Sequence, residues 1–119
     1  MSKLTEQELH QLAMNIVGEE LKKNGFEFLA VNSKLKKNPQ FVALKEKQLH
    51  FVVVRAITYP KSPNDYDEQL LSKVKNHAEK FDAKTHFAGV GLANSKDYDQ
   101  PLDTESGYVL NYQGLTLIE

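Results

Sequence analysis

The run Phe51-Val52-Val53-Val54 constrains the fold more than any other segment of this chain. Its apolar side chains are continuous and do not alternate with polar ones, which predicts a central strand covered on both faces. The run lies in the second arm of a predicted hairpin, whose arms at 40–44 and 49–57 flank the polar residues 45–48. The sequence therefore predicts an α/β (α+β) protein in which helices flank a mixed β-sheet.

Two helices are predicted, one on each side of this hairpin in the sequence. The first begins at the capping box Thr5-x-x-Glu8, in which both side chains satisfy free backbone donors, and residues 22–25 mark its end. The second is expected to begin at Ser62 as the cap and Pro63 in the first turn. Its expected buried face consists of Leu70, Leu71, Val74, Ala78 and Phe81.

The remaining apolar segments predict further strands. Short β-branched and aromatic runs bounded by polar or glycine residues are typical of strands, and they occur at 26–31, 85–93, 108–112 and 115–118. The last two are expected to form a hairpin about Gln113-Gly114. The predicted order is α-β-β-β-α-β followed by a C-terminal β-hairpin, in a single domain over residues 1–119.

Composition excludes several kinds of site. The chain has no cysteine, which rules out disulfides, thiolate zinc sites, a catalytic cysteine and cysteine-ligated iron–sulfur clusters. No apolar run approaches the roughly 20 residues of a membrane span, and the polar N-terminus does not resemble a secretory signal. We therefore expect a cytoplasmic protein with no membrane span, no metal and no cofactor.

Charge is unevenly distributed along the chain. Residues 1–61 carry ten Lys and Arg against six Asp and Glu, whereas residues 62–119 carry five against ten. Such an asymmetry is typical either of an anion-binding face or of two ordinary solvated surfaces. The candidate anion contacts in the basic half are Lys34, Lys36, Lys37, Lys45, Lys47 and Arg55.

Two other features carry weaker signals. The four histidines, His10, His50, His77 and His86, show no metal-ligand spacing, which favours structural or surface roles. The segment Gly89-Val90-Gly91 begins like a dinucleotide-binding fingerprint, but the third glycine and the following helix are absent. Neither feature predicts a ligand.

The predicted hairpin carries a more specific resemblance. Pro39-Gln40-Phe41-Val42-Ala43-Leu44, followed after the turn by Phe51-Val52-Val53-Val54-Arg55, resembles the PD-(D/E)xK nuclease-like (restriction-endonuclease-like) superfamily, particularly its small bacterial members. In that family the hairpin is preceded by a helix and a strand and followed by a helix and a strand. The resemblance places the family's aspartate at Gln40, its glutamate at Val53 and its lysine at Arg55.

These substitutions change the chemistry that the resemblance implies. Magnesium requires oxygen ligands, whereas Gln40 offers one neutral oxygen and Val53 offers none. Arg55 keeps a positive charge and can hold a phosphate, but it stays protonated and cannot act as a base. The resemblance thus implies a non-catalytic module that binds an anionic partner, such as nucleic acid or an acidic protein. Glu19 and Glu20 lie where some relatives add a carboxylate.

Three alternatives stay open. An exposed edge at Tyr108, Tyr112 and Leu115 favours a protein-interaction or homodimerisation module. A displaced active site could draw on Glu19, Glu20, Tyr59, Asp65 and His77. Short chains similar to this one can also carry the name of a sodium-translocating NADH:quinone reductase component, the one that houses FAD and an iron–sulfur cluster, which suggests an accessory protein. A chain without cysteine cannot ligate that cluster.

Overall fold

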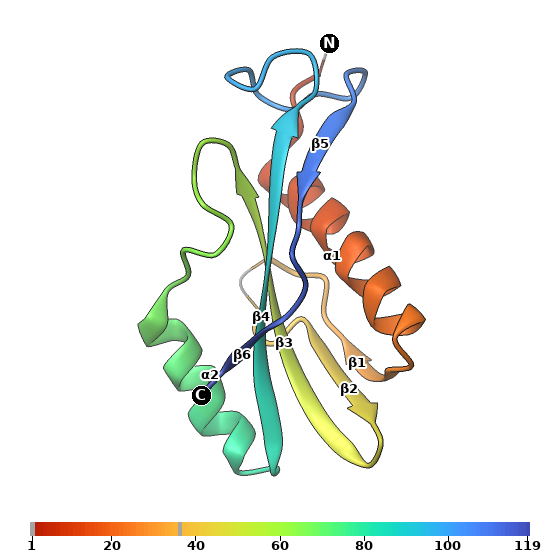
Figure 1. Ribbon diagram of the computed structural model, residues 1–119, viewed down its shortest axis with the longest axis vertical. Coiled ribbons are helices and arrows are strands. Elements are labelled where there is room, and N and C mark those ends of the chain that lie inside the picture. Colours follow the sequence, from red (N-terminus) through yellow and green to blue (C-terminus); the bar gives the residue numbers. More distant parts are fainter. Residues whose placement is uncertain (1, 36) are drawn as a thin grey trace.

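The computed structural model describes residues 2–35 and 37–119, and these contain two helices and one mixed sheet of six strands (Figure 1). The strands lie in the order β1-β2-β3-β4-β5, with β6 also paired to β4. The elements along the chain are α1 (Glu6–Lys23), β1 (Glu27–Val31), β2 (Phe41–Lys45), β3 (Gln48–Thr58), α2 (Glu68–Glu79), β4 (Ala83–Asn94), β5 (Tyr108–Asn111) and β6 (Thr116–Ile118).

Strand β3 is the centre of the sheet. It pairs antiparallel with β2 and parallel with β4. Val52 and Val54 pack into the cluster that α1 covers, whereas Phe51 and Val53 pack into the cluster that α2 covers. Successive side chains of a strand point to opposite faces, so each helix covers its own face of the sheet. The predicted α/β class and the strand buried on both faces are confirmed.

Helix α1 is fixed at both ends by the predicted chemistry. The Thr5 hydroxyl accepts a hydrogen bond from the Glu8 backbone N–H at 3.1 Å, and the Glu8 carboxylate accepts one from the Thr5 N–H at 2.9 Å. Gly25 follows the helix with a φ of +87°, a backbone conformation that glycine adopts without a steric penalty. The capping box and the glycine end are confirmed.

Helix α2 begins later than the sequence suggested. It starts at Glu68 with Asp67 as its N-cap, and the Asp67 carboxylate accepts from the Leu70 backbone N–H at 3.1 Å. The predicted start at Ser62 is wrong, because Ser62 instead begins a turn before the helix, in which its carbonyl accepts a hydrogen bond from the Asp65 N–H. Phe81, predicted to be buried, follows the end of α2 and is exposed.

The segment before α2 packs against β4 through the glycines of Gly89-Val90-Gly91. A Cβ atom at Gly89 would lie 1.9 Å from the Pro63 carbonyl oxygen, and one at Gly91 would lie 3.1 Å from Pro63 Cγ. The glycine pair therefore permits close packing of a loop, which explains the motif without a bound nucleotide.

The C-terminal strands differ from the predicted hairpin. Both β5 and β6 pair antiparallel with β4, β5 along 91–94 and β6 along 85–87, and they do not pair with each other. Because β4 is twelve residues long, its outer edge accommodates both strands one after the other. In Figure 1, β5 lies beside the upper part of β4 and β6 beside its lower part.

Neither helix in the described part of the chain is long and apolar enough to cross a membrane.

Candidate functional site

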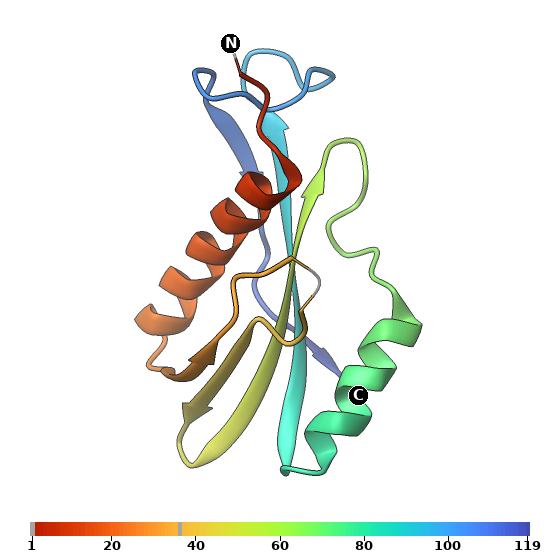
Figure 2. The same cartoon turned by 180° about the vertical axis from the view of Figure 1, so that it is seen from behind.

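The hairpin that carries the nuclease-like resemblance opens into a fork. Pairing between β2 and β3 ends at Phe41 and Val52, whereas β3 continues to Thr58. The loop that connects β1 to β2 lies beside this extension and is held to α1 by a hydrogen bond from the Gln7 amide to the Ser33 carbonyl (Figure 2). The candidate site lies at this fork, between α1, the loop and the upper part of β3.

Gln40 is completely buried at the base of the fork, with 0% of its surface exposed. Its side-chain oxygen accepts a hydrogen bond from the Val54 N–H at 2.8 Å. Its side-chain nitrogen donates to the Lys37 carbonyl at 3.2 Å and to Asn38 Oδ1 at 3.1 Å. The amide thus extends the β-ladder by one step beyond β2, and its oxygen already has a partner within the fold.

Val53 and Arg55 lie in β3, one on each side of Val54 in the sequence. Val53 is fully buried in the core beneath α2. The Arg55 guanidinium reaches the free edge of β3, where Nη1 donates to the Val54 carbonyl and Nη2 to Asn38 Oδ1, both at 2.9 Å. Burial lowers the pKa of Arg55 and Asp67 opposes that effect, but arginine stays protonated in proteins. The fork therefore presents a fixed cation.

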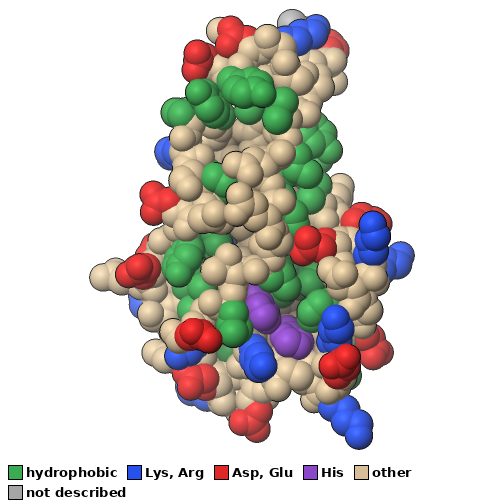
Figure 3. Space-filling model, in the orientation of Figure 1, with side chains coloured by type: hydrophobic (Ala, Val, Ile, Leu, Met, Phe, Trp, Pro, Cys, Tyr) green, Lys and Arg blue, Asp and Glu red, His purple; other side chains and the backbone are tan. Residues whose placement is uncertain are grey.

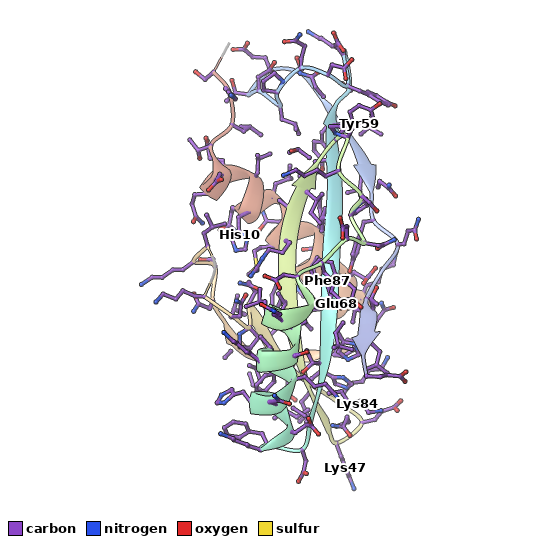
Figure 4. The ribbon with its side chains drawn as sticks, turned by 90° about the vertical axis from the view of Figure 1, so that its left-hand side faces the viewer. His10, Lys47, Tyr59, Glu68, Lys84 and Phe87 are labelled. Carbon is purple, nitrogen blue, oxygen red and sulfur yellow. The ribbon has the colours of Figure 1, made fainter. Side chains whose placement is uncertain are left out.

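A pocket of about 310 Å³ opens at the fork. Its polar groups come from Glu6 and His10 of α1, Arg55 and Thr58 of β3, and Lys61. Leu9, Leu35, Ala56 and Ile57 line the rest. In Figure 4, His10 lies on the side of α1 that faces the loop and β3.

His10, for which the sequence favoured a structural or surface role, lines this pocket. Only 1% of its surface is exposed, and neither ring nitrogen has a hydrogen-bond partner among the described residues. Burial, followed by the nearby Arg55 charge, lowers the pKa of His10, which favours the neutral ring. A buried polar group without a partner usually has a structural or ligand-related reason.

The predicted anion contacts divide between two ends of the molecule. Lys34 and Lys37 are exposed on the loop beside the pocket, and Lys36 lies outside the described residues. Lys45 and Lys47 belong to the β2–β3 turn, with the Lys45 ammonium 5.1 Å from the centre of the Phe26 ring. Figure 4 shows Lys47 far from His10. Of the predicted anion contacts that the structure describes, Lys34, Lys37 and Arg55 lie at the fork.

The residues of the predicted displaced active site are not brought together. Glu19 and Glu20 lie on α1, and Glu20 accepts a hydrogen bond from the Tyr112 hydroxyl at 2.8 Å. Burial, followed by Glu20, raises the pKa of Tyr112. His77 lies on α2 beside Phe51 and Phe81, on the opposite face of the sheet from α1. Tyr59 packs against Tyr98 at the end of β3, and Asp65 lines a second pocket before α2, to which Arg55 also contributes.

Two histidines, His50 and His86, meet on the sheet face that α1 covers. His50 Nδ1 and His86 Nε2 are 2.8 Å apart, and the pair forms the histidine patch visible in Figure 3. Burial, His50 and Lys84 together lower the pKa of His86 to about 4, and burial with Lys84 and Lys45 lowers that of His50. Sequence spacing could not find this pair, because 36 residues separate its members.

Metal-binding capacity is low throughout the described chain. No group of three or more His, Asp or Glu side chains is arranged to hold an ion within residues 2–35 and 37–119. The His50–His86 pair offers two nitrogens, but the nearby lysines disfavour a cation. At the fork, the same argument applies to Arg55.

Comparison with known proteins gives a family without an assigned activity. No curated protein matches the chain. Residues 7–118 match the family described as a domain of unknown function (DUF8840), and the match runs from the second residue of α1 to the end of β6. The chain belongs to this family of domains of unknown function.

Proposed function

We propose that this protein is a catalytically silent, nuclease-like domain that binds an anionic partner, nucleic acid, at the fork between β2 and β3. The observation that carries the proposal is the Arg55 guanidinium at the free edge of β3, at the position that the resemblance aligns with the family's lysine, where it keeps a positive charge that can hold a phosphate. The Gln40 amide is already hydrogen-bonded within the fold, and Val53 is in the core. These groups favour phosphate binding over metal-assisted cleavage.

The local charge supports the same proposal. Arg55 and Lys61 line the pocket together with a single carboxylate, Glu6. Lys34 and Lys37 are exposed on the adjacent loop, so that they are free to contact a backbone phosphate. Lysine and arginine contacts to phosphates release condensed counterions, which makes such binding strong at low salt and weak at high salt.

The fold is compatible with the family resemblance. The described elements run α-β-β-β-α-β from α1 to β4, which is the order that the resemblance requires. The fork occurs at the residues that the resemblance aligns with the family's motif, Gln40 and Arg55. We therefore propose descent from a nuclease-like domain in which the metal ligands have been replaced.

Binding to labelled oligonucleotides over a series of salt concentrations tests the proposal. Single-stranded and double-stranded DNA and RNA should be measured by fluorescence anisotropy with the full chain. We expect an affinity that falls steeply as salt rises, because about 0.7–0.9 of a counterion is released for each neutralised phosphate. Binding that does not change with salt, or no binding at low salt, would contradict the proposal.

Charge-reversal variants test which surface binds the oligonucleotide. The double variant Lys34→Glu with Lys37→Glu should weaken binding at least about tenfold and reduce the salt dependence by about two charges. Lys73→Glu with Lys80→Glu, on exposed positions of α2 and its end, changes the net charge equally but lies away from the fork. Equal losses in both double variants would mean that binding is unspecific attraction to net charge.

A second candidate function is self-association through β5. All four residues of β5 are exposed, including Tyr108, Val109 and Leu110, and its outer edge has no strand partner among the described residues. Such an edge is a template for pairing with a second copy. Tyr112 and Leu115, the other two residues named for this role, instead pack against the core beneath α1.

Light scattering tests the second candidate. A dimer is expected at high protein concentration, and Leu110→Lys should shift it to monomer because a charge on an edge strand disfavours pairing. Leu29→Lys, an exposed position on the opposite edge strand β1, is the matched control and should leave the dimer intact. A strict monomer at every concentration would contradict self-association.

A further inference from the structure

The pocket at the fork contains a buried side chain whose hydrogen-bonding capacity is unused. His10 lines the pocket with 1% of its surface exposed, and among the described residues neither Nδ1 nor Nε2 has a partner. A neutral imidazole has one N–H donor and one acceptor nitrogen. Leaving both unpaired is unfavourable, and a bound group that supplies one acceptor and one donor would remove that cost.

The free edge of β3 offers matching groups beside His10. In this strand, the Val52 carbonyl and the Val54 N–H point toward β2, where Gln40 pairs with both. Backbone groups alternate in direction along a strand, so the N–H and C=O of Ala56 and the N–H of Thr58 point the same way, into the pocket. Pairing with β2 ends at Val52, and the loop and side-chain hydrogen bonds among the described residues include none to these three groups.

This free edge is too short for an added strand. On one side, the Arg55 guanidinium covers the Val54 carbonyl, and on the other the Thr58 carbonyl accepts from the Lys61 N–H at 3.1 Å. The three free groups span about two residues, or roughly 7 Å of strand. Such a span matches one planar ligand with adjacent donors and acceptors, whereas strand addition uses a longer edge.

The volume and charge of the pocket restrict further which ligands it can bind. The pocket volume of about 310 Å³ is at the lower end of the range for small-molecule sites. Arg55 and Lys61 provide cations at the two ends of the edge, and Leu9 and Leu35 provide apolar walls. The complementary ligand is planar, has a donor and an acceptor on one edge, and carries an anion nearby. A nucleotide has all three properties.

We infer that the pocket receives one unpaired nucleotide, with its base edge on His10 and the Ala56–Thr58 backbone and its phosphate on the cation at one end of that edge, Arg55. The inference rests on the proposed function, since it assigns this pocket as the place where the bound strand is read. Glu6, on the same wall, is positioned to accept from an amino group of the base.

Titration of the isotope-labelled full chain with nucleoside monophosphates tests the inference. AMP, GMP, CMP and UMP are the probes, and ribose 5-phosphate and inorganic phosphate are the controls that lack a base. At least one nucleotide should shift the backbone amide signals of Ala56 and Thr58 and bind at least about tenfold more tightly than ribose 5-phosphate, because base contacts add to the phosphate contact. Equal affinity for ribose 5-phosphate, or no shift with any nucleotide at about 10 mM, would overturn the inference.

Substitutions of His10 test binding in the pocket separately from binding to the anion surface formed by Lys34 and Lys37. His10→Leu removes both ring nitrogens and should weaken nucleotide binding about tenfold or more, whereas His10→Gln retains a donor and an acceptor and should restore part of it. His77→Leu, at an exposed histidine on α2, is the matched control and should bind as the original chain does. Thermal unfolding of each variant checks that the fold is retained.

The proposed function and this inference can fail separately. Salt-dependent oligonucleotide binding combined with unperturbed Ala56 and Thr58 amides would overturn the pocket assignment and leave the anion surface in place. Loss of both oligonucleotide and nucleotide binding would overturn both. If His10→Leu binds nucleotides as tightly as the original chain, the role given to His10 is wrong even though the pocket is occupied.

Discussion

The side-chain oxygen of Gln40 accepts a hydrogen bond from the backbone N–H of Val54 over 2.8 Å, and this bond defines the base of the fork. The proposed nuclease-like origin would place a metal-binding acid at this position. Here the side chain instead replaces a missing backbone partner after β2 ends. Gln40 therefore has a structural role in this fold.

We predict that Gln40→Ala lowers the free energy of unfolding by about 2–4 kcal/mol, because the buried Val54 N–H loses its partner and a cavity forms. Gln40→Glu should also destabilise, since its carboxylate would face the Lys37 carbonyl and Asn38 Oδ1, which the amide nitrogen now contacts. Urea unfolding measures both effects, and the exposed Gln113→Ala is the control. A Gln40→Ala protein as stable as that control would contradict the structural role.

The close approach of Pro63 to β4 predicts different effects for two glycines. Gly89→Ala should destabilise by at least about 2 kcal/mol or displace the loop, because the new Cβ would lie 1.9 Å from the Pro63 carbonyl oxygen. Gly18→Ala, in the middle of α1, should be neutral or stabilise by up to about 1 kcal/mol, because its Cβ would meet only Phe41 at 3.4 Å. Thermal and urea unfolding measure both variants. Similar stabilities would show that the loop does not pack against β4 in this way.

The two possible caps of α2 can be distinguished by alanine substitution. Asp67→Ala should cost about 0.5–2 kcal/mol because the carboxylate accepts from the Leu70 N–H. Ser62→Ala should change stability by less than about 0.5 kcal/mol, since only the Ser62 backbone takes part in its turn. Urea unfolding with helix content followed by circular dichroism gives both values. A larger loss of stability in Ser62→Ala than in Asp67→Ala would contradict Asp67 as the cap and place the helix start at Ser62.

The parts of the fold that the sequence predicted correctly depend on local chemistry. The Thr5–Glu8 capping box and Gly25 act within a few residues, so their patterns are sufficient to position α1. The continuous apolar run of β3 indicates burial on both faces without reference to its partners. The expected helix start at Ser62 was wrong because a cap residue followed by proline is also compatible with a turn.

The candidate site depended on contacts that no local pattern encodes. Gln40 and Val54 are 14 residues apart, and His10 and Arg55 come from different elements. The spacing of apolar residues could not reveal that β5 and β6 pair with β4, because strand pairing is a choice among partners with similar patterns. For the same reason, His50 and His86 were treated as separate residues although their ring nitrogens are in contact.

The His50–His86 contact predicts a dependence of stability on pH. Both histidines have a lowered pKa in the folded protein, that of His86 falling from 6.5 to about 4. The unfolded chain therefore binds more protons between pH 4 and 6.5, and the free energy of unfolding should rise with pH across this window. Burial is the largest cause for both rings; beyond it, Lys84 and Lys45 disfavour protonation of His50, and His50 and Lys84 disfavour protonation of His86.

We expect protonation of the pair to lower the free energy of unfolding by on the order of 2 kcal/mol. This stability is fully present at pH 7 and largely lost near pH 4. The double variant His50→Gln with His86→Gln should show a smaller rise in unfolding free energy between these limits, measured by urea unfolding at each pH. The control variant His77→Gln, at an exposed position, should retain the full rise. If the double variant and the control follow the same curve, protonation of this pair does not limit stability in acid.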